Sequence, residues 1–142
     1  MIEWNEKYEL GIDIIDQQHK QLIKISNKLY ELLTNATYGS DIYDDIVEVI
    51  DEIKEYTVYH FTTEENLLAK YGYFSLDDHI LQHKDLISKI EDLNLTNLDE
   101  DQVIYGKKIL NYLINWIFKH ISGTDFLYKE FLKKHLNEQS QK

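Results

Sequence analysis

The sequence of 142 residues contains no cysteine and no proline, and each absence narrows what the chain can be. Without cysteine there are no disulfides and no thiolate metal ligands, which suits a reducing compartment and predicts a cytoplasmic protein. Without proline nothing forces a helix to kink or stop, so long uninterrupted helices are favoured.

Long apolar runs are missing as well. No stretch approaches the roughly 20 residues that a membrane-spanning helix requires. The first ten residues, MIEWNEKYEL, lack the basic and then apolar pattern of a secretory signal. We therefore expect no membrane partner and no export.

Positive charge is scarce, because 15 Lys and Arg stand against 26 Asp and Glu, a formal net charge of −11. Such a chain repels a phosphate backbone, which argues against nucleic-acid binding. Hydrophobic residues make up 43% of the sequence, enough for one globular domain with its own core. The high charge and the lack of an obvious apolar outer face predict a monomer.

Four segments carry notable residues at alternating steps of three and four, the spacing of a helix face that packs against other helices. In the first segment this face consists of Ile12, Ile15, His19, Leu22, Ser26, Leu29 and Leu33. In the second it consists of Ile46, Ile50, Ile53, Thr57, His60, Glu64, Leu67 and Tyr71. In the third it consists of Leu76, His79, His83, Leu86, Ile90 and Leu93. In the fourth it consists of Val103, Gly106, Leu110, Leu113, Ile117 and His120.

Breaks in the pattern separate these segments at 35–41, 71–78, 94–101 and 122–125. Four helices of roughly 18–30 residues with short connections predict an all-α fold, an antiparallel up-down-up-down four-helix bundle. We expect a single domain, 1–142, made of an N-terminal arm (1–11), the bundle (12–122) and a C-terminal helix and tail (123–142). Trp4 and Tyr8 are the expected anchors of the arm.

The packing faces contain polar side chains that a core does not normally hold, namely His19, His60, Glu64, His79, His83 and His120. Each alone has an ordinary explanation, such as a structural or surface histidine pair. Together they place a contribution on each of the four helices, and a buried polar group without a partner costs a few kcal/mol. His135 lies outside these faces and is expected to be an ordinary surface residue.

A metal would satisfy these groups together. Imidazole suits iron, zinc, copper and nickel, and a carboxylate can join two metals. Asp125 supplies a seventh donor, since it follows His120 by five residues, just beyond Gly123. Its alternative role is the N-cap of the last helix.

Four motifs carry a resemblance to a known family: DQQH at 16–19, HFTTEE at 60–65, HILQH at 79–83 and HISGTD at 120–125. With the N-terminal segment IEWNEKYELGIDIID, they make the whole chain similar to the hemerythrins, specifically the single-domain bacterial ones. The resemblance implies two iron ions in a nonheme di-iron centre with an oxo or hydroxo bridge, and no heme. It also implies dioxygen as the ligand.

Carried over by position, the resemblance places one iron on His79, His83 and His120 and the other on His19 and His60. Glu64 and Asp125 would bridge the two. These side chains and a shared hydroxide would fill all but one coordination place of two six-coordinate irons. The open place lies on the iron with two histidines, and an open place is where a small molecule binds.

Apolar side chains near these ligands should keep the oxygen pocket dry. We expect Leu22, Ile23, Trp116 and Ile117 to line this pocket, whereas Leu113 is expected to be plain core. Ligating imidazoles usually need outer partners that orient them. The candidates for that role are Asp16, Glu65 and Gln82.

The function predicted is reversible dioxygen binding, for oxygen carriage, storage or delivery, without enzymatic activity. The alternatives are a di-iron oxidase or peroxidase, a nitric-oxide-handling enzyme, an oxygen or redox sensor, and a structural metal site. The sequence lacks the Glu-x-x-His motifs of ferritin-like di-iron enzymes. A sensor would usually need an output domain, for which this length leaves no room.

Overall fold

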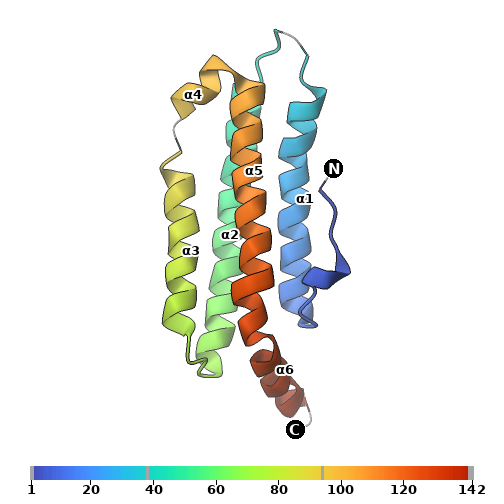
Figure 1. Cartoon of the computed structure of the whole chain (residues 1–142), viewed down its shortest axis with the longest axis vertical. Helices are drawn as coiled ribbons and strands as arrows, with labels where there is room; N and C mark the ends of the chain where they lie inside the picture. Colours follow the sequence, from blue (N-terminus) through green and yellow to red (C-terminus); the bar gives the residue numbers. More distant parts are fainter. Residues whose placement is uncertain (1, 38, 94, 141–142) are drawn as a thin grey trace.

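The computed structural model describes residues 2–37, 39–93 and 95–140. Its four long helices are α1 (Asp13–Asn35), α2 (Tyr43–Lys70), α3 (Leu76–Glu91) and α5 (Gln102–His120). They run alternately up and down beside one another (Figure 1), which confirms the predicted antiparallel bundle. Parts of the predicted arm, breaks and tail, at residues 1, 38, 94, 141 and 142, lie outside the described residues.

Two connections differ from the expected breaks. Between α3 and α5 the chain forms a short helix, α4 (Leu95–Glu100), whose Leu98 is fully buried under the end of the bundle. After α5 the chain makes a π-helical turn (Ile121–Asp125) and continues into α6 (Phe126–Ser140). The predicted break at 122–125 is therefore wrong: the chain stays helical, and one wide turn replaces the loop.

The predicted packing faces are buried in all four helices. The exceptions, all half-buried, are Leu67, Tyr71, Leu76, Leu93 and Val103. Helix α3 has 16 residues, somewhat fewer than expected, because it ends before Leu93. Helices α1 and α5 approach closely at Gly106, where an added Cβ would lie 2.5 Å from Cδ2 of Leu33.

The N-terminal arm runs along the outside of α1 (Figure 1) and contains a single 3-10 turn (Glu6–Tyr8). The ring of Tyr8 packs on Phe118, with centroids 4.5 Å apart. Leu10, which follows, is completely buried and is the stronger anchor. Among the described residues no helix combines the length and apolar character needed to cross a lipid bilayer.

Candidate metal centre

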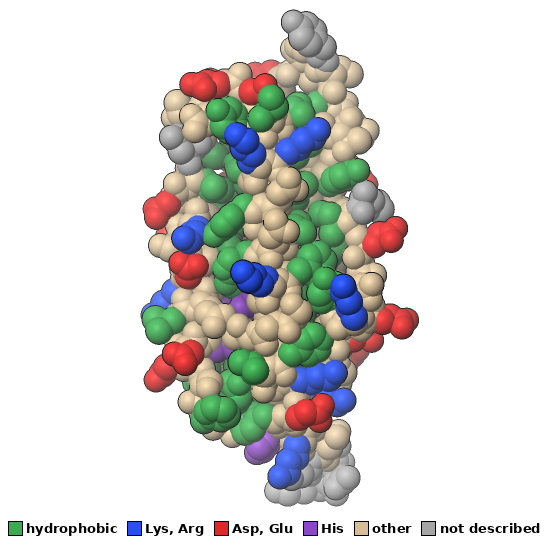
Figure 2. Space-filling view, viewed as in Figure 1, with side chains coloured by type: hydrophobic (Ala, Val, Ile, Leu, Met, Phe, Trp, Pro, Cys, Tyr) green, Lys and Arg blue, Asp and Glu red, His purple; other side chains and the backbone are tan. Residues whose placement is uncertain are grey.

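The seven predicted donors converge in the bundle interior, each at most 6% exposed. Helix α1 contributes His19, α2 contributes His60 and Glu64, α3 contributes His79 and His83, α5 contributes His120, and the π-turn contributes Asp125. Little histidine surface is visible on the face drawn in Figure 2.

The π-turn explains why Asp125 reaches this cluster. Five residues separate it from His120, a spacing that an α-helix would turn away from the same face. A π-helical turn closes its hydrogen bonds between residues five apart, so positions 120 and 125 share a side. Asp125 is therefore delivered to the bundle axis while the helix continues.

The donor atoms form two overlapping groups, within each of which they lie no more than 4.8 Å apart. One group contains Glu64, His79, His83, His120 and Asp125, and the other contains His19, His60, Glu64 and Asp125. Both carboxylates belong to both groups, as bridging ligands would, and the five histidines divide three to two. The individual ligand roles stay a prediction, but the geometry that they require is present.

The bridging carboxylates face imidazole nitrogens on both sides. The Nε2 atom of His19 lies 3.2 Å from Oδ2 of Asp125, and those of His79 and His120 lie 3.1 Å from Oδ1. Glu64 places Oε2 3.1 Å from Nε2 of His60. Its Oε1 contacts Nε2 of His79 and lies 3.2 Å from Nε2 of His83.

Several of these buried atoms have no hydrogen-bond partner: Nδ1 of His19 and His79, Oε2 of Glu64, and both carboxylate oxygens of Asp125. These carboxylate oxygens lie beside imidazole nitrogens but not in hydrogen-bond geometry, and a buried polar atom without a hydrogen bond costs about 1–3 kcal/mol. Protein contacts alone therefore leave this cluster incompletely satisfied. Five imidazoles and two shared carboxylates are a suitable set for a pair of transition-metal ions. The residues therefore fit a two-metal centre.

Charge complementarity within the metal-free cluster is strong. Burial favours the protonated carboxyl of Glu64, but the imidazoles of His60, His79 and His83 outweigh it and hold its pKa well below the ordinary value. Burial would lower the pKa of His79, but Asp125 and Glu64 raise it to about 9. Metal binding at His79 therefore has to displace a proton at neutral pH.

Outer partners orient three of the five imidazoles. Nδ1 of His60 donates to Oε1 of Gln18 at 2.7 Å, and Nδ1 of His83 donates to Oε2 of Glu65 at 2.8 Å. Nδ1 of His120 donates to Oε1 of Gln82 at 3.1 Å. Since amide and carboxylate oxygens can only accept, each of these rings donates from Nδ1 to its outer partner and turns Nε2 toward the cluster.

Two of the three residues that the sequence offered as orienting partners, Glu65 and Gln82, thus contact site histidines. Asp16 does something else: its carboxylate accepts from the backbone amides of Leu10 and Gly11, at 2.9 and 3.0 Å. Gln18 was missed, although it is 5% exposed and lies three residues after Ile15 and four before Leu22, so the same spacing could have found it.

A small cavity of about 10 Å³ adjoins His19 and His60, near the smallest size that holds one water molecule. Its walls include Leu22, Trp116 and Ile117, and also Thr57, Phe61 and Ile121. The expected Ile23 is not among the lining residues; it is 4% exposed and belongs to the apolar cluster that also contains Ile15 and Leu68. That the cavity receives dioxygen stays a prediction.

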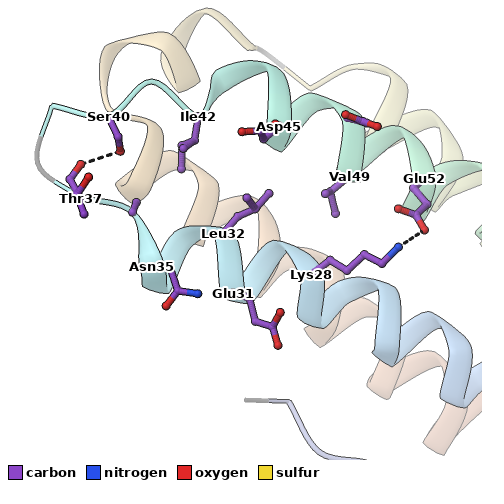
Figure 3. A pocket seen from close by; sticks show the side chains of 12 residues that line it. Lys28, Glu31, Leu32, Asn35, Thr37, Ser40, Ile42, Asp45, Val49 and Glu52 are labelled. Atoms are coloured by element: carbon purple, nitrogen blue, oxygen red, sulfur yellow. Dashed lines mark hydrogen bonds and ion pairs between the residues drawn. The ribbon is translucent and has the colours of Figure 1, made fainter.

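A larger hollow of about 630 Å³ lies between the C-terminal part of α1 and the N-terminal part of α2 (Figure 3). Its charged side chains include Glu31, Asp45 and the ion pair of Lys28 with Glu52, whose Nζ and Oε1 are 2.7 Å apart. No histidine lines it. It is an open groove of mixed charged and apolar side chains, such as Leu32 and Val49, rather than a set of converging donors.

Comparisons with known proteins agree with this geometry. A family model described as the hemerythrin HHE cation binding domain matches residues 10–132. A bacteriohemerythrin from Clostridium acetobutylicum is 44% identical over 125 residues, which cover 88% of this chain and 96% of that protein. A myohemerythrin from Riftia pachyptila is 30% identical over 126 residues, covering 89% of each chain.

The fold is also shared with solved structures. A crystal structure of wild-type hemerythrin superposes with a TM-score of 0.76 at 25% sequence identity. The superposition covers 93% of this chain and 98% of that one.

Proposed function

The chain belongs to the hemerythrin family, and from this premise we propose that it binds dioxygen reversibly, for oxygen carriage, storage or delivery. Members of this family bind oxygen at a di-iron centre, and the seven donors of this chain suit that cofactor. We propose that His79, His83 and His120 hold one iron, that His19 and His60 hold the other, and that Glu64 and Asp125 bridge them.

One observation carries the proposal: the two donor groups share their carboxylates but contain unequal numbers of histidines. The poorer group, with His19 and His60, is the one whose histidines both line the small cavity. An incompletely ligated metal beside a cavity is a place for a small molecule to bind. When bound there, a pair of ferrous ions supplies the electrons that dioxygen takes up and returns.

The side chains that line the cavity exclude water and protons from the ligand site. Leu22 and Ile117 are 2% and 4% exposed and close the cavity with apolar surface. Thr57 is the one hydroxyl side chain among the lining residues, and its proton is committed to the carbonyl of Ile53 at 2.6 Å. The wall therefore has no free hydroxyl donor, which favours reversible binding over protonation and turnover.

An enzymatic role is the second candidate, and it would require access for a reductant. The groove of about 540 Å³ outside Trp116 and His120 is the observation that favours it. We propose binding rather than catalysis because the cavity wall offers no free hydroxyl that could protonate a bound ligand. A cytoplasmic location is proposed from the absence of cysteine.

An absorption experiment tests the function. The protein is reconstituted with ferrous iron without oxygen, its metal content is measured, and spectra are recorded in argon, in air and again in argon. We expect two irons per chain, a visible band that appears in air, and its loss when oxygen is removed. A band that appears once and does not reverse, or multiple turnovers with an added reductant, would favour the enzyme.

A further inference from the structure

One of the three outer partners differs in charge from the other two. His60 and His120 donate to the neutral amides of Gln18 and Gln82, whereas His83 donates to the carboxylate of Glu65. Glu65 follows the bridging Glu64 on α2 but points to the outer side of the imidazole. The three-histidine group therefore has an outer negative charge that the two-histidine group lacks.

The imidazole of His83 is held firmly for this interaction. Phe61 lies flat on the ring, with centroids 3.6 Å apart and planes 1° from parallel. Nδ1 donates to Glu65 at 2.8 Å, and Nε2 lies 3.2 Å from Oε1 of Glu64. The Glu65 side chain is 28% exposed, so solvent screens its charge only in part.

We propose that Glu65 is a positioning and charge-tuning residue. Its carboxylate makes His83 a stronger electron donor to the metal held by the three-histidine group. A carboxylate draws the Nδ1 proton toward itself and gives the ring more imidazolate character, which strengthens donation from Nε2. A neutral amide does this far less. The metal in this group is then held more tightly, and its reduction potential is lower. The inference rests on the proposed ligand set, but not on oxygen binding.

Orientation alone does not require a charge at this position. Gln82 holds His120 at 3.1 Å while also accepting from Thr124 at 2.5 Å. Gln18 holds His60 at 2.7 Å and donates to Thr63 at 3.3 Å. Since amides orient two of the rings, the carboxylate at the third has to be explained by its charge.

The first test is Glu65→Gln, which keeps the shape and a hydrogen-bond acceptor but removes the charge. Cobalt(II) is titrated into the metal-free protein and followed by its visible absorption, and midpoint potentials are measured on the iron-loaded protein. We expect the tighter cobalt-binding step to weaken about tenfold and the potential to rise. An unchanged affinity and an unchanged potential would overturn the proposal.

Transferring the carboxylate from position 65 to another outer partner distinguishes an effect of its charge from an effect of its hydrogen bond alone. Glu65→Gln/Gln82→Glu transfers the carboxylate to His120, within the same donor group, and should restore both the affinity and the potential. The matched control, Glu65→Gln/Gln18→Glu, places it on His60 in the other group and should not. Equal rescue by both, or rescue by neither, would show that Glu65 acts only as a structural partner.

Folding and function are controlled separately. Circular dichroism shows whether each variant keeps its helices, and Gln82→Glu alone provides a further measurement, because it should tighten the same cobalt-binding step in a chain that retains Glu65. Neither readout uses dioxygen. Failure of reversible oxygenation would therefore overturn the proposed function while leaving the result on Glu65 intact.

Discussion

The indole of Trp116 stacks on the imidazole of His120, with ring centroids 4.5 Å apart and planes 18° from parallel. These two side chains line both the small cavity at the metal centre and the groove outside it. They are therefore the wall between the centre and solvent. Trp116→Ala should keep both irons but shorten the lifetime of the oxygenated protein, because water gains access. The decay of the visible band in air measures this, and Trp116→Phe, which retains an aromatic wall, should decay more slowly than the alanine variant.

Leu22 and Leu113 provide a matched pair that separates the cavity wall from ordinary core. They are 2% and 1% exposed, but only Leu22 lines the cavity. Replacing either by alanine should destabilise the protein by about 2–5 kcal/mol. Only Leu22→Ala should also speed oxidation of the oxygenated protein while retaining iron. Equal oxidation rates in the two variants would show that Leu22 does not protect the site.

His83→Ala should lose iron and oxygen binding together. The change removes one donor of the three-histidine group and leaves Glu65 without its imidazole partner. Iron per chain, measured after reconstitution and desalting, reports the loss. His135→Ala is the control, since its ring packs on Phe131 in α6, with centroids 4.4 Å apart, outside both donor groups. Full iron content in the His83 variant would contradict the ligand assignment.

Periodicity was sufficient to predict the bundle and most of the site, because a residue on the packing face of a long helix has to meet the axis. The interpretation that placed His19, His60, His79 and His120 inside depended only on steps of three and four. Periodicity does not reveal short elements, since the 6 residues of α4 are too few to show a repeat. Asp125 was named as a donor, but the π-turn that delivers it could not be read from local spacing.

Contacts between helices were the other limit. Spacing places Gln18 on the buried side of α1 but does not show that it meets His60 of α2, and Asp16 instead binds the arm. Ile23 is expected in the pocket together with Leu22 because both lie about one turn beyond His19, yet adjacent helical residues point about 100° apart and only Leu22 lines the cavity. The sequence supplies the faces of the helices, whereas the partner of each outer side chain depends on their packing.

The carboxylate of Asp16 fastens the N-terminal arm to the first turn of α1. It accepts from the amides of Leu10 and Gly11, and Gly11 adopts a φ of 79°, which other residues rarely tolerate. Asp16→Ala would leave these amides without their charged acceptor and should lower the free energy of unfolding by about 2 kcal/mol. Urea unfolding measures the loss, and faster hydrogen exchange at Leu10 and Gly11 would locate it in the arm. Asp13→Ala is the control, because Asp13 lies exposed in the same helical turn and should cost about 0.5 kcal/mol through the helix dipole. Equal losses in the two variants would mean that Asp16 contributes only as a first-turn charge.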